Sequence, residues 1–157
     1  DRHHTYVRSM TPAIHTWLDR LVDHHGERHD ELAAVRETFD DLSKDLATHM
    51  LKEEHLLFPC IAELEAARIR GTRLPSNAFG TILNPIKVLE TDHARIGALA
   101  TRLRRLTDGF VAPGDACMTY RLCYDALCIF EQDLHRHVHL ENNILFPRAL
   151  EVERGLI

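Results

Sequence analysis

Apolar residues recur along almost the whole chain at alternating spacings of three and four residues, which is the period of an α-helix and not of a strand. The pattern predicts four long helices, over residues 3–25, from about 30 to 65, from 82 or 85 to beyond 103, and from about 116 to 150. Glycine- and proline-bearing turns separate them, with the longest predicted loop at residues 71–84. Four long helices with short connections predict an all-α, up-down-up-down four-helix bundle.

Two prolines fall inside the predicted helices. Pro12 lies in the first, where we expect a kink or a broken first turn, and Pro59 is expected to bend the second. Pro85 suits the first turn of the third helix, because its fixed backbone angle and missing N–H are tolerated there.

Five polar residues occupy seam positions that the helical period assigns to the bundle interior, where an unpaired imidazole or carboxylate would be costly. They are His49, Glu53, His93, His137 and Glu141. Four of them belong to a phrase that occurs twice, in residues 49–59 and 137–147, and that reduces both times to HxxxExxxLFP. Residues four apart share one face of a helix, so each copy can direct an imidazole and a carboxylate to one point.

A sixth candidate follows from the pseudo-repeat of the two halves. His4 stands 45 residues before His49, much as His93 stands 44 residues before His137. His4 and His25 are 21 residues apart, about 31 Å along a straight helix, so they cannot both bind one compact centre. Because the second helix is expected to run antiparallel to the first, His4 and His49 should lie at the same height along the bundle axis. We therefore predict His4 as the ligand, His3 as the fallback, and His25 as a helix-terminal or supporting residue.

The predicted ligand set joins four imidazoles with two carboxylates and contains no thiolate, which suits two metal ions better than one. Bridging carboxylates and terminal histidines would leave positions for a solvent-derived bridge and an exogenous ligand. Nitrogen and oxygen donors favour iron or manganese over copper(I), and a carboxylate-bridged pair in a bundle core is typical of di-iron sites. The predicted metal ligands are His4, His49, Glu53, His93, His137 and Glu141.

The remaining histidines and the cysteines are assigned no role in the site. His135 and His139 lie on a different face from the seam and are predicted to be exposed, and His15, His29 and His55 are predicted to be surface residues. The four cysteines form no CxxC pair and are interpreted as reduced thiols.

Bulk properties exclude several classes of protein. The 157 residues suit one domain, and a net charge of −5 with dispersed basic residues argues against nucleic-acid binding. No apolar stretch reaches the ~18 residues of a membrane helix, and no secretory signal is visible, so we expect a cytoplasmic protein without a membrane span. The chain begins with Asp1 and not with methionine, which we interpret as a fragment or a processed product.

Four phrases carry a resemblance to a known family: HMLKEEHLLFP, VLETDHARIG, LTDGFVAPGDAC and HVHLENNILFPRAL. They resemble the hemerythrin-like domain of the di-iron repair of iron centres proteins, bacterial proteins linked to nitrosative and oxidative stress. The resemblance covers nearly the whole chain, residues 1–157, and implies two non-haem iron ions with an oxo or hydroxo bridge on the six predicted ligands. It also matches His25, in LVDHHGERH, to a further histidine of the family. Full-length members often carry an additional N-terminal cysteine-bearing domain.

The resemblance implies a function in the repair of damaged iron–sulfur clusters, by iron donation or by nitric oxide handling at the di-iron site. The implied partners are O2 or NO as small ligands and damaged iron–sulfur proteins as clients, with a monomer or dimer as the working form. The expected role is not enzymatic, apart from a nitric oxide reductase-type side activity.

Three other functions are alternatives for a metal-binding helical bundle of this kind. A hemerythrin-type module that stores or senses O2 or NO remains open. A ferritin-like oxidase is disfavoured, because those sites are rich in carboxylates and here histidine outnumbers glutamate two to one. A structural zinc site is disfavoured because it requires four closed tetrahedral ligands, often thiolates.

Overall fold

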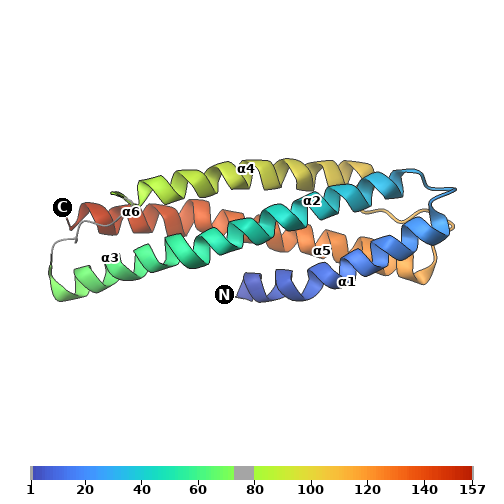
Figure 1. Ribbon diagram of the computed structural model, residues 1–157. Coiled ribbons are helices and arrows are strands. Elements are labelled where there is room, and N and C mark those ends of the chain that lie inside the picture. Colours follow the sequence, from blue (N-terminus) through green and yellow to red (C-terminus); the bar gives the residue numbers. More distant parts are fainter. Residues whose placement is uncertain (1, 73–79, 157) are drawn as a thin grey trace. The chain divides into compact units, whose positions relative to one another are not determined.

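The computed structural model describes residues 2–72 and 80–156, and within those ranges it is helical and contains no strand (Figure 1). The predicted all-α class is confirmed. Residues 73–79 of the predicted loop lie outside the described ranges. The elements are α1 (Arg2–His25), α2 (Glu31–Lys52), η1 (Glu53–Leu57), α3 (Phe58–Arg70), α4 (Leu83–Leu106), α5 (Met118–Leu140), η2 (Glu141–Leu145) and α6 (Phe146–Arg154).

Several of these elements follow one another without a break. α2, η1 and α3 form one helical stretch from Glu31 to Arg70, and α5, η2 and α6 form another from Met118 to Arg154. The predicted second and last helices therefore exist and run a few residues further than expected. Gly71 ends α3 in the left-handed conformation, with φ of 63°, and its N–H bonds to the carbonyls of Ala67 and Arg68.

Pro85 lies in the first turn of α4, as predicted, and the bend expected at Pro59 stays a prediction. α1 runs through Pro12 as one helix, so the expected broken turn is absent. Pro12 and Arg8 are both exposed, so water can hydrate the Arg8 carbonyl, which loses its amide donor four residues on.

A π-helical turn precedes Pro59, and a second one precedes Pro147. The N–H of Phe58 bonds to the carbonyl of Glu53, five residues back, and the N–H of Phe146 bonds in the same way to the carbonyl of Glu141. Each wide turn begins at a glutamate of the repeated phrase. Single π turns inside α-helices frequently accompany functional sites, and these two were not predicted from the sequence.

Contacts divide the chain into two compact units, residues 1–46 with 95–136 and residues 47–94 with 137–157, called here the first and the second unit. α2, α4 and α5 each contribute residues to both units. A single domain over residues 1–157 stays a prediction. None of the described helices has the length and apolar character needed to cross a membrane.

The first unit is an up-down-up-down four-helix bundle. Its apolar interior includes Ile14 and Leu18 of α1, Phe39 of α2, and Phe130 of α5, all almost fully buried. Each of the four helices is joined to its two neighbours in the bundle by contacts between acidic side chains and arginine or histidine. The pairs are Asp19–Arg36 (α1–α2), Asp45–Arg95 (α2–α4), Arg104–Glu131 (α4–α5) and His3–Asp133 (α1–α5). The bundle predicted from the three-four rhythm is confirmed.

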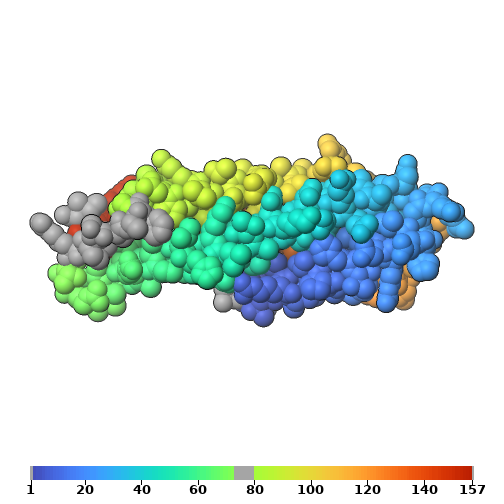
Figure 2. Space-filling model, in the orientation of Figure 1, coloured from blue at the N-terminus to red at the C-terminus, as the bar shows by residue number. Residues whose placement is uncertain are grey.

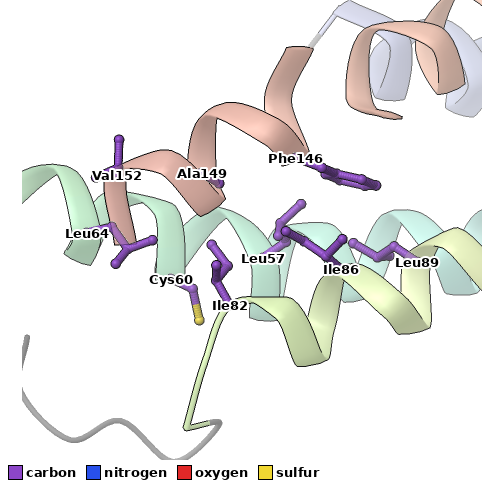
Figure 3. Close-up of a cluster of buried hydrophobic side chains, with 9 residues drawn as sticks. All are labelled: Leu57, Cys60, Leu64, Ile82, Ile86, Leu89, Phe146, Ala149 and Val152. Carbon is purple, nitrogen blue, oxygen red and sulfur yellow. The ribbon is translucent and has the colours of Figure 1, made fainter. Parts of the chain in front are cut away.

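The second unit contains a separate apolar cluster, drawn in Figure 3. Its buried residues come from η1 and α3, from Ile82 and the start of α4, and from α6: Leu57, Cys60, Leu64, Ile82, Ile86, Leu89, Phe146, Ala149 and Val152. This cluster packs the same three helical stretches that carry the polar seam residues of the repeated phrases. It therefore fixes the backbone on which those polar side chains stand.

Glu153 is a buried carboxylate that holds the start of α4. Its Oε1 accepts the N–H of Ile82 at 2.7 Å, and its Oε2 accepts the hydroxyl of Thr81 at 2.6 Å. Glu153→Ala leaves a buried N–H without this acceptor, so we expect a loss of about 1–3 kcal/mol in the free energy of unfolding. Urea denaturation measures this loss, with Glu151→Ala, at an exposed position of the same helix, as the matched control. Equal stability of the two variants would contradict this role.

Candidate metal centre

Five of the six predicted ligands come together in the second unit. His49 is in the last turn of α2 and Glu53 begins η1; His137 is in the last turn of α5 and Glu141 begins η2; His93 is in the middle of α4. Each of the five is at most 7% exposed. The repeated phrase thus places one imidazole and one carboxylate on each of two helical stretches, and α4 supplies a third imidazole.

The donor atoms of these side chains face one another. His93 Nε2 lies 3.0 Å from Glu141 Oε2 and 3.2 Å from His49 Nε2. His137 Nε2 lies 3.4 Å from both Glu53 Oε1 and Glu141 Oε2. His49 Nε2 completes the group, at 3.8 Å from Glu53 Oε1 and 3.9 Å from Glu141 Oε2. One ligand atom from each of the four repeat residues falls within 4.8 Å of the others, an arrangement that could hold a metal ion.

Burial changes the acid–base properties of the cluster. It lowers the pKa of His49 to about 4, an effect that the nearby Glu53 charge only partly opposes. It raises the pKa of Glu141 to about 7, although the hydrogen bond with His93 acts in the opposite direction. A neutral imidazole is the form that binds a metal, and a cation offsets the cost of burying carboxylates. The donor set therefore fits a hard or borderline cation such as iron.

Polar side chains behind the histidines fix their orientation. Asn142 Oδ1 accepts a hydrogen bond from His93 Nδ1 at 3.0 Å, which directs Nε2 into the cluster. The carboxylate of Asp92 lies 3.7 Å from His49 Nδ1 and accepts a hydrogen bond from Lys52 Nζ at 2.6 Å. Sequence reasoning missed these supports. The available signal was adjacency, since Asp92, Asn142 and Lys52 each directly precede or follow a ligand candidate.

The sixth predicted ligand, His4, belongs to the first unit, as do His3 and His25. His4 is 2% exposed on α1, with its ring centroid 6.1 Å from that of His3. His4 as a ligand stays a prediction. His3 Nδ1 bonds to the carboxylate of Asp133, and His3 as the fallback ligand stays a prediction. His25 is the last residue of α1, as predicted, and its Nε2 lies 3.3 Å from Cys117 Sγ.

Predictions for the remaining histidines were partly wrong. His55, His135 and His139 are exposed as expected, whereas His15 and His29 are half-buried. His15 bonds to Ser43 and packs on Phe39, and His29 bonds to Asp115. His15 lies on α1, where a residue at the edge of a helix seam can turn its ring toward a neighbouring helix. His29 lies between α1 and α2, where helical periodicity makes no prediction about contacts.

An apolar surface hollow of about 260 Å³ is lined by residues that lie close in the sequence to Glu53 and His93. It is lined by Lys52 and Leu56 on one side and by Pro85, Val88 and Leu89 of α4 on the other, with Asn84 at its edge. Figure 2 shows the face of the second unit on which the green helical stretch and the yellow-green start of α4 lie side by side. Lys52 and Leu89 lie one residue and one helical turn from Glu53 and His93 respectively.

Asn142 offers a test of the support behind His93. We expect Asn142→Ala to weaken metal binding by about 10- to 100-fold, because the His93 ring loses the acceptor that fixes its Nδ1 proton. Competition with a chelator measures the affinity. Asn143→Ala is the matched control, since Asn143 is exposed and its side-chain amide bonds to the ring and the carbonyl of His139, one turn back. A loss of the same size in both variants would refute the assigned role of Asn142.

The chain is similar to known proteins over nearly its whole length. The family model described as the hemerythrin HHE cation binding domain matches residues 1–149. The chain is 35% identical over 149 residues, 95% of its length and 62% of the relative's, to the iron-sulfur cluster repair protein YtfE of Edwardsiella ictaluri. It is 32% identical to a probable iron-sulfur cluster repair protein of Haemophilus influenzae over 95% of the chain and 61% of that protein. It is 34% identical to the iron-sulfur cluster repair protein YtfE of Yersinia pestis, over 97% of the chain and 63% of that protein. The chain thus spans about three fifths of these relatives.

Proposed function

The chain belongs to the family of hemerythrin HHE cation-binding domains, and on that basis we propose that it holds iron and acts in the repair of iron–sulfur clusters damaged by nitrosative or oxidative stress. The observation that carries the proposal is the convergence of three imidazole Nε2 atoms and two carboxylates at a buried point of the second unit. The relatives' names point to cluster repair. The proposed clients are damaged iron–sulfur proteins, in the cytoplasm.

The proposed ligands are those predicted from the sequence: His4, His49, Glu53, His93, His137 and Glu141. They would hold two non-haem irons, bridged by an oxo or hydroxo group. Bound iron supplies a coordination position for O2 or NO and a store of metal that can be transferred. The family match and the nitrogen- and oxygen-only donor set support this assignment.

The chain's own residues bind and orient the metal in this proposal. Asn142 holds the His93 ring with Nε2 inward, and the Lys52–Asp92 pair lies behind His49. Only two carboxylates serve two irons, which gives the centre less anionic charge than a four-carboxylate site has. We therefore expect iron to be released more readily after reduction, as an iron donor requires. Retention of both irons by the reduced protein in the presence of a chelator would count against donation.

A second candidate function is reversible binding or sensing of O2 or NO. The apolar hollow beside Lys52 and Leu89 favours it, because an uncharged diatomic molecule partitions into an apolar pocket more readily than an ion does. The two functions differ in what leaves the protein: a gas in one case and iron in the other.

Repair activity can be tested on a purified [4Fe–4S] enzyme inactivated by nitric oxide. The protein is loaded with iron under anaerobic conditions, freed of excess metal and mixed with the damaged enzyme. We expect the wild type and the exposed-site control Glu151→Gln to restore activity, and Glu141→Gln to fail. Reactivation by Glu141→Gln at the wild-type rate, or by the same amount of a free ferrous salt, would exclude cluster repair through this centre.

A further inference from the structure

A second group of reactive side chains lies in the first unit, where α1 ends and α5 begins. His25 is the last residue of α1, and Cys117 directly precedes Met118, the first residue of α5. Cys117 is exposed, and His25 Nε2 lies 3.3 Å from its sulfur. None of these residues belongs to the proposed metal centre. We propose that Cys117 and His25 form a thiol–imidazole pair that reacts with low-molecular-weight disulfides.

The imidazole of His25 is positioned by the fold. The buried Tyr120 contacts it edge to face, with ring centroids 5.5 Å apart, and contacts His29 similarly at 5.6 Å. Both nitrogens of His29 lie near carboxylates, with Nε2 3.2 Å from Asp115 and Nδ1 3.4 Å from Glu31. The carboxylates therefore engage His29, and His25 is the imidazole that faces the thiol.

The position of Cys117 at the start of α5 also favours the reaction of its thiol with disulfides. The N–H of Arg121 bonds to the carbonyl of Cys117 at 3.2 Å, so Cys117 stands at the N-terminal cap of the 23-residue α5. The positive end of the helix dipole stabilises a thiolate at such a position, and a neighbouring imidazole accepts the thiol proton. Imidazole, helix end and solvent access thus meet at one sulfur atom.

The other three cysteines provide an internal contrast. Cys60 and Cys123 are buried, and burial raises the pKa of both thiols, to about 12 for Cys123. Cys128 is half-buried, accepts a hydrogen bond from the amide of Gln132 at 3.4 Å and lies close enough to Arg104 for an electrostatic interaction. Neither the amide nor the guanidinium can take up the thiol proton. Of the four thiols, Cys117 is therefore the one placed to react with a disulfide.

The reaction is a thiol–disulfide exchange. The Cys117 S–H proton passes to His25 Nε2, and the thiolate attacks one sulfur of the disulfide RS–SR. A Cys117–SR bond forms as the RS–SR bond breaks, and the leaving thiolate RS⁻ takes up the proton. Cys117 is oxidised and the released thiol is reduced, so no other oxidant is required. Glutathione disulfide represents the substrate class.

The probe for the test is dithionitrobenzoate, a disulfide whose released thiolate is coloured. We expect one fast equivalent in the folded wild type at neutral pH, located on Cys117 by peptide mass spectrometry. Cys117→Ser should abolish the fast phase, and His25→Gln should slow it about tenfold and change how its rate depends on pH, because the proton acceptor is lost. Cys128→Ser and His29→Gln are the matched controls and should retain it.

The groups that face the pair enter the interpretation of the pH profile. They are His29 and Tyr120, with Asp115, Glu31 and Arg28 around His29. A fast phase that persists in Cys117→Ser, or equal rates and profiles for His25→Gln and the wild type, would overturn the proposal. Circular dichroism of each variant verifies that the helices are intact. If His25→Gln unfolds, Cys117→Ser and the labelled peptide still decide which thiol reacts. This test is independent of iron, so its failure would leave the proposed repair function untouched.

Discussion

Glu53→Gln is expected to reduce bound iron from about two per chain to a small fraction, with an affinity loss of at least about 100-fold. Loss of a residue behind a ligand costs 10- to 100-fold, and loss of a charged ligand should cost more. Glu53 is completely buried, with Oε1 3.4 Å from His137 Nε2 and 3.8 Å from His49 Nε2. The amide keeps the volume but removes the negative charge and one acceptor atom. Elemental analysis after iron loading and desalting measures the effect.

The matched control for Glu53→Gln is the same change at the next residue, Glu54→Gln, because Glu54 is half-buried and lies outside the cluster. The control should bind iron as the wild type does. Full iron content in Glu53→Gln, or equal losses in the two variants, would contradict the assignment of Glu53 as a ligand.

Phe146→Ala is expected to lower the free energy of unfolding by about 3–5 kcal/mol, the usual cost of removing a buried aromatic ring. Phe146 is 2% exposed in the apolar cluster of the second unit, and its ring stacks on that of His93, with centroids 5.8 Å apart and planes 6° apart. Loss of the ring opens a cavity and removes the flat surface that supports a proposed ligand. Urea denaturation of the metal-free protein measures stability, and chelator competition measures the accompanying loss of iron affinity.

The repeat provides the control for this second variant. Phe58 occupies the equivalent position of the first phrase but is only half-buried. Phe58→Ala should therefore destabilise the protein less than Phe146→Ala does. Equal destabilisation by the two changes would show that burial of Phe146 against His93 and the apolar cluster has no special importance.

The fold was largely predictable, because helical periodicity depends on which residues face the interior and this chain keeps that pattern over long stretches. Local departures of the backbone from α-helical geometry were not predictable from the spacing of apolar residues. The π turns at Glu53 and Glu141 insert one residue into the hydrogen-bond ladder, a change that leaves the apolar spacing almost intact. The continuity of α1 through Pro12 was not predicted, because helical periodicity does not report how the carbonyl four residues before a proline is solvated.

The candidate site was predictable where a polar residue interrupted an apolar seam. His49, Glu53 and His93 stand out in this way because a buried polar group needs a partner. Asp92 and Asn142 did not stand out, because polar residues are common beside helix seams and only the folded geometry turns these two toward histidine rings. The assignment of His4 as a ligand depends on the symmetry of the two halves of the sequence and stays a prediction.

The number of irons per chain tests the central claim most directly. Protein loaded with ferrous iron under anaerobic conditions and then desalted is assayed for iron, and its absorption spectrum is recorded after air oxidation and again after reduction with dithionite. We predict about two irons per chain and near-ultraviolet absorption of a bridged ferric pair that bleaches on reduction. One tightly bound zinc ion, or no stoichiometric metal, would contradict the proposed di-iron centre.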